Sequence, residues 1–129
     1  ESHPMADKII MIEGSSIEKS IVEKIKKLIP SDSKVLVILD SNHTEDHVLE
    51  ELRLYTGLVT VDSYCIVCDT IVAQMAEGFY KNCPWGINNN PKGAVEKFLK
   101  ESPSFIIDDE IDAKLLLSMS PKGYLKRIT

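Results

Sequence analysis

The stretch VLVILDSNHTEDHV, residues 35–48, places a polar turn between an apolar segment and a helical pattern. Its first five residues are continuously apolar, as in a strand covered on both faces by helices. The polar turn of residues 40–43 follows, and Thr44 is then expected as the N-cap of a helix. A buried strand that leads through a short turn into a helix predicts an α/β fold.

The rest of the chain repeats this alternation. Apolar residues recur at helical spacing over residues 16–29, with Ser15 and Glu18 as an expected capping box. The expected elements are strands at 8–12, 34–39 and 60–69, helices at 16–29, 44–57 and 91–100, a short helix or turn at 70–78, and strand-like segments at 104–109, 114–120 and 124–128. This order predicts one domain over residues 1–129, with a mostly parallel sheet closed by a C-terminal antiparallel hairpin through the turn SPKGY.

Length and charge restrict the expected partners. A chain of 129 residues is sized for a single domain with its own core. Its net charge of −5, with no basic cluster longer than Lys26 and Lys27, argues against nucleic acid as a partner. The apolar runs are much shorter than the ~20 residues that cross a bilayer, so no membrane partner and a cytoplasmic location are expected.

Three cysteines, an odd number, fit a reducing compartment rather than a disulfide framework. Cys65 and Cys68 form a CxxC pair, which is typical of zinc or redox sites. They fall in an expected strand, where residues three apart point to opposite faces, and no second CxxC completes a site. Two core cysteines are therefore favoured over a zinc site.

Two acids follow expected strands, Asp40 after the strand at 34–39 and Asp69 after the next. Ligands of parallel α/β sheets bind beyond the carboxyl ends of the strands. Two such carboxylates suit a hard cation such as Mg²⁺, and His43 suits a proton acceptor. The alternatives are that Asp40 only shapes a turn, that Asp69 only caps a helix, and that His43 faces solvent.

A long loop at residues 79–90 carries Trp85, the only tryptophan. Its Asn, Pro and Gly content predicts irregular structure. Trp85 is interpreted either as a packing anchor or as part of a substrate lid, since long loops in compact domains tend to be functional.

Four segments in order resemble one protein family: DSNHTEDHVLEEL, DSYCIVCDTIV, PWGINNNPKGAVEKFL and LLLSMSPKGYLKRI. The chain resembles the cephalosporin hydroxylase and rhamnosyl O-methyltransferase family over nearly its whole length. The resemblance implies the Rossmann-like fold of class I S-adenosylmethionine (SAM) methyltransferases, with the sheet order 3-2-1-4-5-7-6. It therefore implies SAM and Mg²⁺ as cofactors.

The resemblance also implies roles for particular residues. Asp40 and Asp69 match the acids that bind Mg²⁺ at the ends of the fourth and fifth strands, and His43 matches a basic residue three positions after the first acid. Some relatives have an acid or amide beside the second metal acid, where this chain has Cys68 and Thr70. His43 is the expected catalytic base.

Cofactor contacts are expected at two strand ends. Gly14, Ser15 and Ser16 match the small residues that lie near the adenine of SAM, and Ser41 is a further candidate beside the first metal acid. The glycine-rich loop that holds the methionine part of SAM in this fold has no counterpart here, because no GxG occurs. We therefore expect the chain to be the C-terminal part of a larger methyltransferase-like domain and to lack the first two strands of that domain.

In that arrangement the strand at 8–12 loses its usual neighbours. It would pair directly beside the strand at 34–39, or another chain would supply strands, or the edges would stay exposed. The expected function is Mg²⁺-dependent methyl transfer from SAM to the hydroxyl of a sugar, a β-lactam or another small molecule. The alternatives are a non-catalytic fragment or oligomeric assembly module, with a homo-oligomer as a possible state, and a small-molecule binder without chemistry.

Overall fold

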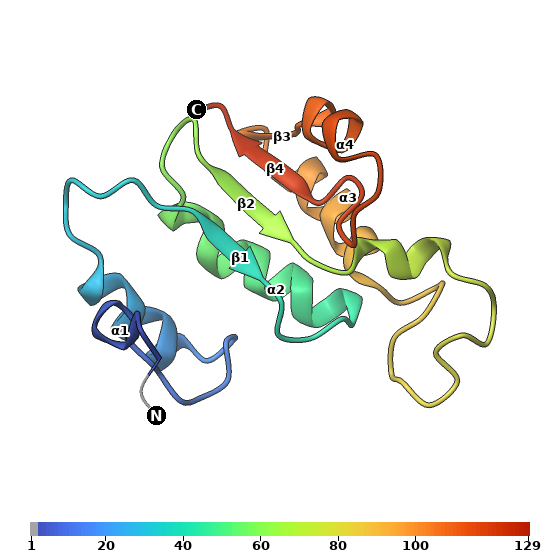
Figure 1. Ribbon diagram of the computed structural model, residues 1–129, viewed down its shortest axis with the longest axis horizontal. Coiled ribbons are helices and arrows are strands. Elements are labelled where there is room, and N and C mark those ends of the chain that lie inside the picture. The colour runs from blue at the N-terminus through green and yellow to red at the C-terminus, as the bar shows by residue number, and fades with distance from the viewer. Residues whose placement is uncertain (1–2) are drawn as a thin grey trace.

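Four strands form one mixed sheet in the computed structural model, which describes residues 3–129 (Figure 1). The strands are β1 (Val37–Leu39), β2 (Tyr64–Val67), β3 (Phe105–Ile107) and β4 (Tyr124–Arg127). Their order is β1-β2-β4-β3, with β1 parallel to β2 and β4 antiparallel to both of its neighbours. Pairing is thus mixed rather than mostly parallel, and the order reproduces the 4-5-7-6 part of the order that the family resemblance implies.

Helices α2 (Glu45–Tyr55) and α3 (Pro91–Glu101) pack side by side behind the sheet (Figure 1). Helix α1 (Lys19–Leu28) lies near the β1 edge and α4 (Asp109–Leu115) beyond β3 and β4. Short 3₁₀ turns η1 (Ala6–Lys8), η2 (Thr56–Leu58) and η3 (Thr70–Gln74) complete the fold. None of the helices within residues 3–129 is long and apolar enough to cross a bilayer.

The hydrophobic core fills the space between the sheet and the α2–α3 pair. Fully buried residues from both layers contribute to it: Leu52 from α2, Val95 from α3, and Cys65, Val67 and Leu125 from the sheet. Burial of such apolar side chains supplies the main stabilisation of the fold. Cys65 is a core residue as expected, whereas Cys68, also expected in the core, is only half-buried because it follows the end of β2.

The opposite face of the sheet is open in part, which corrects the expectation that β1 is covered on both faces. Leu36 is 49% exposed and Ile38 is 59% exposed. Ile38 lies beside Ile66 of β2, and Ile106 on β3 is also exposed. Within residues 3–129, the apolar run at 35–39 is therefore well covered on only one face of the sheet.

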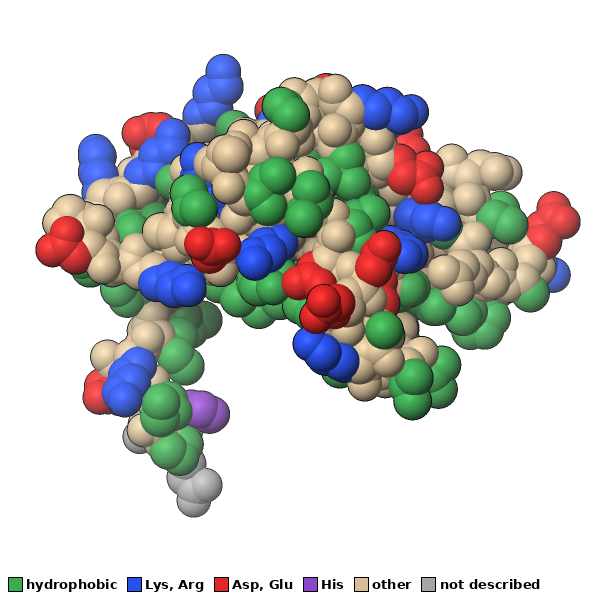
Figure 2. Space-filling model, turned by 90° about the horizontal axis from the view of Figure 1, so that it is seen from above, with side chains coloured by type: hydrophobic (Ala, Val, Ile, Leu, Met, Phe, Trp, Pro, Cys, Tyr) green, Lys and Arg blue, Asp and Glu red, His purple; other side chains and the backbone are tan. Residues whose placement is uncertain are grey.

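The strand expected at residues 8–12 is wrong. Within residues 3–129 this segment pairs with no strand, and Ile9, Ile10 and Met11 are exposed. The N-terminal segment projects from the body of the molecule (Figure 2). A strand requires a neighbour for its backbone hydrogen bonds, and the local sequence does not supply one. None of the described residues before Val37 adds a strand to the free edge of β1.

The first helix also begins later than expected. Helix α1 starts at Lys19 with Glu18 at its N-cap, and no side chain caps it. Ser15 instead contributes its backbone carbonyl, which accepts a hydrogen bond of 3.0 Å from the Glu18 N–H. The expected capping box is therefore replaced by a backbone turn.

The expected strand at 114–120 and its tight hairpin are wrong as well. Lys114 and Leu115 end α4, and Leu116 has a positive φ of 63°. The turn before β4 does form, with a 2.8 Å hydrogen bond from the Gly123 N–H to the Ser120 carbonyl. The antiparallel pair at the C-terminus is β3–β4, joined through α4.

Candidate active site

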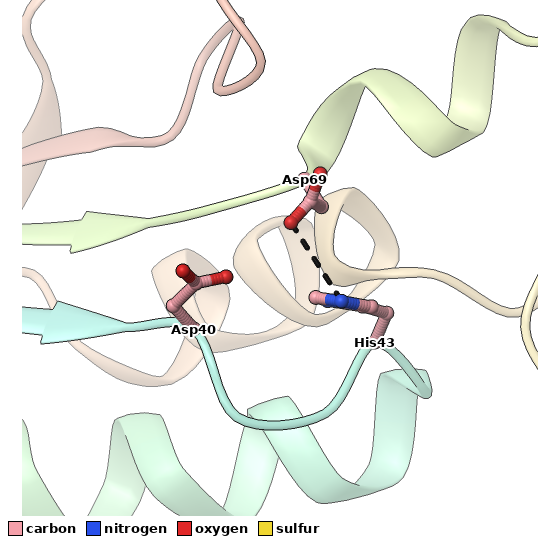
Figure 3. Close-up of side chains that lie close together, drawn as sticks. All are labelled: Asp40, His43 and Asp69. Atoms are coloured by element: carbon pink, nitrogen blue, oxygen red, sulfur yellow. Dashed lines mark ion pairs between the residues drawn. The ribbon is translucent and has the colours of Figure 1, made fainter.

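Three side chains converge where β1 and β2 end (Figure 3). Asp40 follows β1, His43 lies in the next turn and Asp69 follows β2. One ligand atom from each lies within 4.8 Å of the others, and the Nε2 of His43 is 3.7 Å from the Oδ2 of Asp69. Asp40 is exposed and the other two are half-buried, so the cluster is open to solvent.

Pairing between the strands continues past their ends and brings the two acids together. The N–H of Cys68 donates a 3.0 Å hydrogen bond to the carbonyl of Leu39, so the residues that follow are adjacent. Asp69 adopts a left-handed conformation with φ 55° and ψ 25°. The Thr70 hydroxyl donates a 2.7 Å bond to the Pro121 carbonyl. The turn before β4 therefore supports the Asp69 side of the cluster.

The turn that carries His43 is fixed by Asn42. Its Oδ1 accepts hydrogen bonds from the Thr44 N–H at 2.9 Å and from the Thr44 hydroxyl at 2.8 Å. Thr44 is the N-cap of α2 as expected, although its side chain does not cap the helix. This side-chain turn sets the distance between Asp40 and the start of α2.

Trp85 packs against His43 in an edge-to-face arrangement, with ring centroids 4.9 Å apart and planes at 89°. Asn89, in the same loop, accepts a 2.8 Å hydrogen bond from the Glu45 N–H at the start of α2. The loop at 79–90 is thus attached to the cluster, and Trp85 is a packing partner of the candidate base.

The electrostatic environment of the cluster is negative. The pKa of the Cys68 thiol is raised by burial and by the charge of Asp40, with a smaller effect of Asp69, while a hydrogen bond with Ser120 opposes the rise. Among residues 3–129, neither Asp40 nor Asp69 pairs with a lysine or arginine. Two uncompensated carboxylates with an imidazole beside them are a donor set that fits a divalent cation.

A second polar cluster lies next to the first, on the other side of Ser41. The Ser41 hydroxyl donates a 2.6 Å hydrogen bond to the Oε1 of Glu51, and it lies 3.3 Å from the Ser16 hydroxyl. The Nε2 of His47 lies 3.0 Å from the Ser16 oxygen and 3.6 Å from the Glu51 carboxylate. In a serine–histidine–acid relay, one ring nitrogen of the histidine contacts the serine and the other contacts the acid. Both contacts of His47 use its Nε2, so this cluster is not such a relay.

Glu51 is only 1% exposed, and its Oε2 has no hydrogen-bond partner among the described residues. It lines a cavity of about 440 Å³ together with Ser16, Asp40, Ser41 and Tyr55. The remaining wall is apolar and includes β1. A buried carboxylate oxygen without a hydrogen-bond partner is energetically costly, which makes Glu51 an unusual residue for this cavity wall.

The four residues expected to contact the cofactor do not all lie at one cavity. Ser16 and Ser41 line the same cavity, whereas Gly14 and Ser15 are exposed in the preceding loop and do not border it. Glu51 and His47 were missed, although an acid on the apolar face of α2 was a recognisable sequence sign. Tyr55 was missed as a site residue, and its hydroxyl bonds to the Ser16 carbonyl at 2.7 Å.

The fold and the site together describe a Rossmann-like α/β domain with two acids and a histidine clustered at the strand ends. The family model for Rhamnosyl O-methyltransferase/CmcI matches residues 1–128, so the chain belongs to this family. No solved structure matches the chain significantly.

Curated relatives carry the same family name. The chain is similar to the Rhamnosyl O-methyltransferase of Mycobacterium leprae (strain TN), with 36% identity over 127 residues, 92% of this chain and 50% of the relative. It is 30% identical over 121 residues to that of Mycobacterium tuberculosis (strain ATCC 25618 / H37Rv), 92% of this chain and 47% of the relative. The chain spans about half the length of the curated relatives it matches.

Proposed function

We propose that the chain carries the metal and acceptor side of a SAM-dependent, Mg²⁺-dependent O-methyltransferase that acts on a sugar or small-molecule hydroxyl. The observation that supports it best is the convergence of Asp40, His43 and Asp69 at the ends of adjacent parallel strands. Family membership supports O-methyl transfer as the reaction class.

In this proposal each residue has a distinct role. Asp40 and Asp69 hold Mg²⁺ through their carboxylate oxygens, and His43 accepts the proton of the acceptor hydroxyl at its Nε2. When bound, Mg²⁺ supplies positive charge that favours an ionised hydroxyl, and SAM supplies the methyl group. Trp85 limits the rotation of the His43 ring by packing against it.

The cavity beside Ser41 supports a site for SAM. Its lining contains the carboxylates of Asp40 and Glu51 and the hydroxyls of Ser16 and Ser41, with no lysine or arginine. SAM carries a sulfonium and an ammonium group, so a wall of acids and hydroxyls suits it electrostatically. The carboxylate of Glu51 adds negative charge to this wall, and its Oε2 is buried with no hydrogen-bond partner among the described residues.

Isothermal titration of Mg²⁺ into three variants tests the metal assignment. We expect Asp40→Asn and Asp69→Asn each to weaken Mg²⁺ binding by about tenfold or more, because each removes a charged oxygen ligand. Asp62→Asn is the matched control, since Asp62 also has a left-handed φ, of 61°, and lies outside the cluster. Equal Mg²⁺ affinity in all variants would refute the assignment.

Titration of SAM with and without Mg²⁺ tests the cofactor assignment. We expect SAM to bind, and we expect Ser16→Ala and Ser41→Ala each to weaken this binding. Binding that neither variant changes would remove the cavity beside Ser41 from the proposal.

A second candidate function is assembly rather than chemistry. It rests on the free edge of β1, where Leu36 and Ile38 are exposed. An unpaired strand edge is a template for pairing with another chain, including a second copy of this one. Association that rises with concentration, with no binding of SAM or Mg²⁺, would favour this candidate.

A further inference from the structure

The carboxylate of Asp69 reaches the cluster from a backbone conformation that is uncommon for residues with a side chain. Its φ of 55° and ψ of 25° lie in the left-handed region. Such a conformation persists where the surrounding structure imposes it. The contacts on either side of Asp69 therefore determine whether its carboxylate faces Asp40 and His43 (Figure 3).

The turn at residues 119–123 contacts the chain on both sides of this aspartate. On the strand side, the N–H of Val67 donates a 2.9 Å hydrogen bond to the carbonyl of Gly123, the last residue of the turn. On the helix side, the N–H of Ile71 donates a 3.3 Å bond to the carbonyl of Met119, the first residue of the turn. One turn from the C-terminal part of the chain thus holds both flanks of the strained position.

Thr70 adds a side-chain bond between these two backbone contacts. It is fully buried, and its hydroxyl donates a 2.7 Å hydrogen bond to the carbonyl of Pro121, in the middle of the turn. The bond starts one residue after Asp69, so it fixes the backbone directly beside the left-handed position. Without the hydroxyl, the Pro121 carbonyl loses this donor and residue 70 is no longer tied to the turn by its side chain.

The place of the Asp69 carboxylate depends on this backbone geometry. A side chain points in a different direction when φ changes from positive to negative, because side-chain direction follows backbone conformation. In the observed conformation the Oδ2 of Asp69 lies 3.7 Å from the Nε2 of His43. Removing a group that orients a metal ligand typically lowers metal affinity by about 10–100-fold.

We propose that Thr70 is a positioning residue for the metal cluster and acts through Asp69. Its bond to the turn at 119–123 holds Asp69 in the left-handed conformation, and this conformation brings the carboxylate to Asp40 and His43. The effect on metal affinity rests on the proposed function, whereas the effect on the backbone of Asp69 does not require a metal. The turn before β4 thereby has a role in metal binding in addition to its role in the sheet.

Two variants at position 70 separate the hydroxyl from the shape of the side chain. Thr70→Val keeps the branched shape and removes the hydroxyl, whereas Thr70→Ser keeps the hydroxyl. Thr56→Val is the matched control, because Thr56 is also buried and its hydroxyl also donates to a backbone carbonyl, that of Leu52, at 2.6 Å. Thr56 begins η2, directly after α2, and lies outside the cluster. Each valine variant therefore loses one hydrogen bond of the same kind.

The first measurement is made by NMR without metal. A strong nuclear Overhauser effect between the amide proton and the Hα of one residue marks a positive φ, because these two protons then lie closest together. We expect this signal at Asp69 to weaken in Thr70→Val and to keep its wild-type strength in Thr70→Ser and Thr56→Val.

The second measurement is isothermal titration of Mg²⁺ into the same four proteins, with circular dichroism to show that each is folded. We expect affinity to be about tenfold weaker in Thr70→Val alone. If Thr70→Val does not fold, Thr70→Ala and Thr56→Ala are compared in the same way, since neither places a methyl group against the carbonyl that the hydroxyl contacted.

The outcomes separate this inference from the proposed function. An unchanged Overhauser effect at Asp69 in Thr70→Val refutes the positioning role, whether or not the chain binds Mg²⁺. Equal losses of Mg²⁺ affinity in Thr70→Val and Thr56→Val also refute it, because they indicate a general loss of stability. If the wild type binds no Mg²⁺ but the signal weakens in Thr70→Val alone, the metal assignment fails and the role of Thr70 in placing Asp69 is supported.

Discussion

The side chain of Asn89 accepts a 2.8 Å hydrogen bond from the backbone N–H of Glu45, 44 positions earlier in the chain. Its amide nitrogen donates a second bond, also 2.8 Å, to the Pro84 carbonyl. The first turn of a helix has N–H groups without intrahelical partners, and Asn89 satisfies one of them from another segment. The same residue therefore holds the start of α2 and the Trp85 loop together.

Asn89→Ala is expected to lower the free energy of unfolding by about 1 kcal/mol, as for the loss of a helix cap. Thermal unfolding monitored by circular dichroism measures this. Trp85 emission is expected to shift toward that of an exposed indole, because the loop loses its attachment. Asn88→Ala, which keeps both Asn89 bonds, serves as the control. Equal melting temperatures for the two variants would show that the cap contributes no stability.

Gly123 is required by close packing between strands. A Cβ at this position would lie 2.3 Å from the Val67 carbonyl oxygen, which is backbone and has little freedom to move. Gly123→Ala is expected to destabilise the chain by about 1–3 kcal/mol in urea unfolding, because β4 must move away from β2. Gly57→Ala is the matched control, since nothing lies within 4 Å of its added Cβ. Comparable midpoints would contradict the steric argument.

Cys65 makes stability depend on alkaline pH. Burial, with a smaller effect of Glu51, raises the pKa of its thiol from 9.0 to about 12. The folded state keeps the proton that the unfolded state releases, so this contribution is complete below pH 9 and declines between pH 9 and about 12. At pH ~10.5 the loss is about 2 kcal/mol.

Urea unfolding at pH ~8 and at pH ~10.5 is used to compare the wild type with Cys65→Ala. The variant lacks the thiol, so its stability is expected to fall less between pH ~8 and ~10.5. Tyr55, whose pKa is also raised by burial, contributes equally in both proteins. The same pH-dependent loss in wild type and variant would exclude Cys65 as the source.

The two edges of the sheet are expected to behave differently. β1 and β3 are the outer strands, and each exposes an isoleucine, Ile38 at 59% and Ile106 at 47%. If β1 is the edge that associates, Ile38→Lys lowers self-association in sedimentation velocity and Ile106→Lys does not. An equal effect of both variants would indicate nonspecific apolar contact rather than pairing at β1.

The sequence predicted the elements whose limits are encoded locally. Asn90 and Pro91 mark the start of α3, and the Asn90 side chain accepts a bond from the Gly93 N–H. The segments at 8–12 and 114–120 have strand-like composition but no strand partner within the described residues. Strand formation depends on a neighbour elsewhere in the fold, and composition alone cannot supply this information.

The part of the candidate site that local sequence patterns encode was also predictable. Asp40 and Asp69 follow apolar runs, and the ends of parallel strands meet at one edge of a sheet, so their proximity followed from the pattern. The contact of Trp85 with His43 depends on how a long loop folds back, which no periodicity describes. The link between Glu51 and Ser41 depends on the packing of α2 and was missed for the same reason.

Asp69 occupies a left-handed backbone conformation that an L-residue with a side chain adopts at a cost of about 1 kcal/mol relative to glycine. Glycine at this position would relieve the strain and remove the carboxylate. A library of variants selected only for folding would therefore tend to lose the acid, while a library selected for metal-dependent chemistry would retain it. Position 69 is where evolution toward stability and evolution toward activity are expected to separate first.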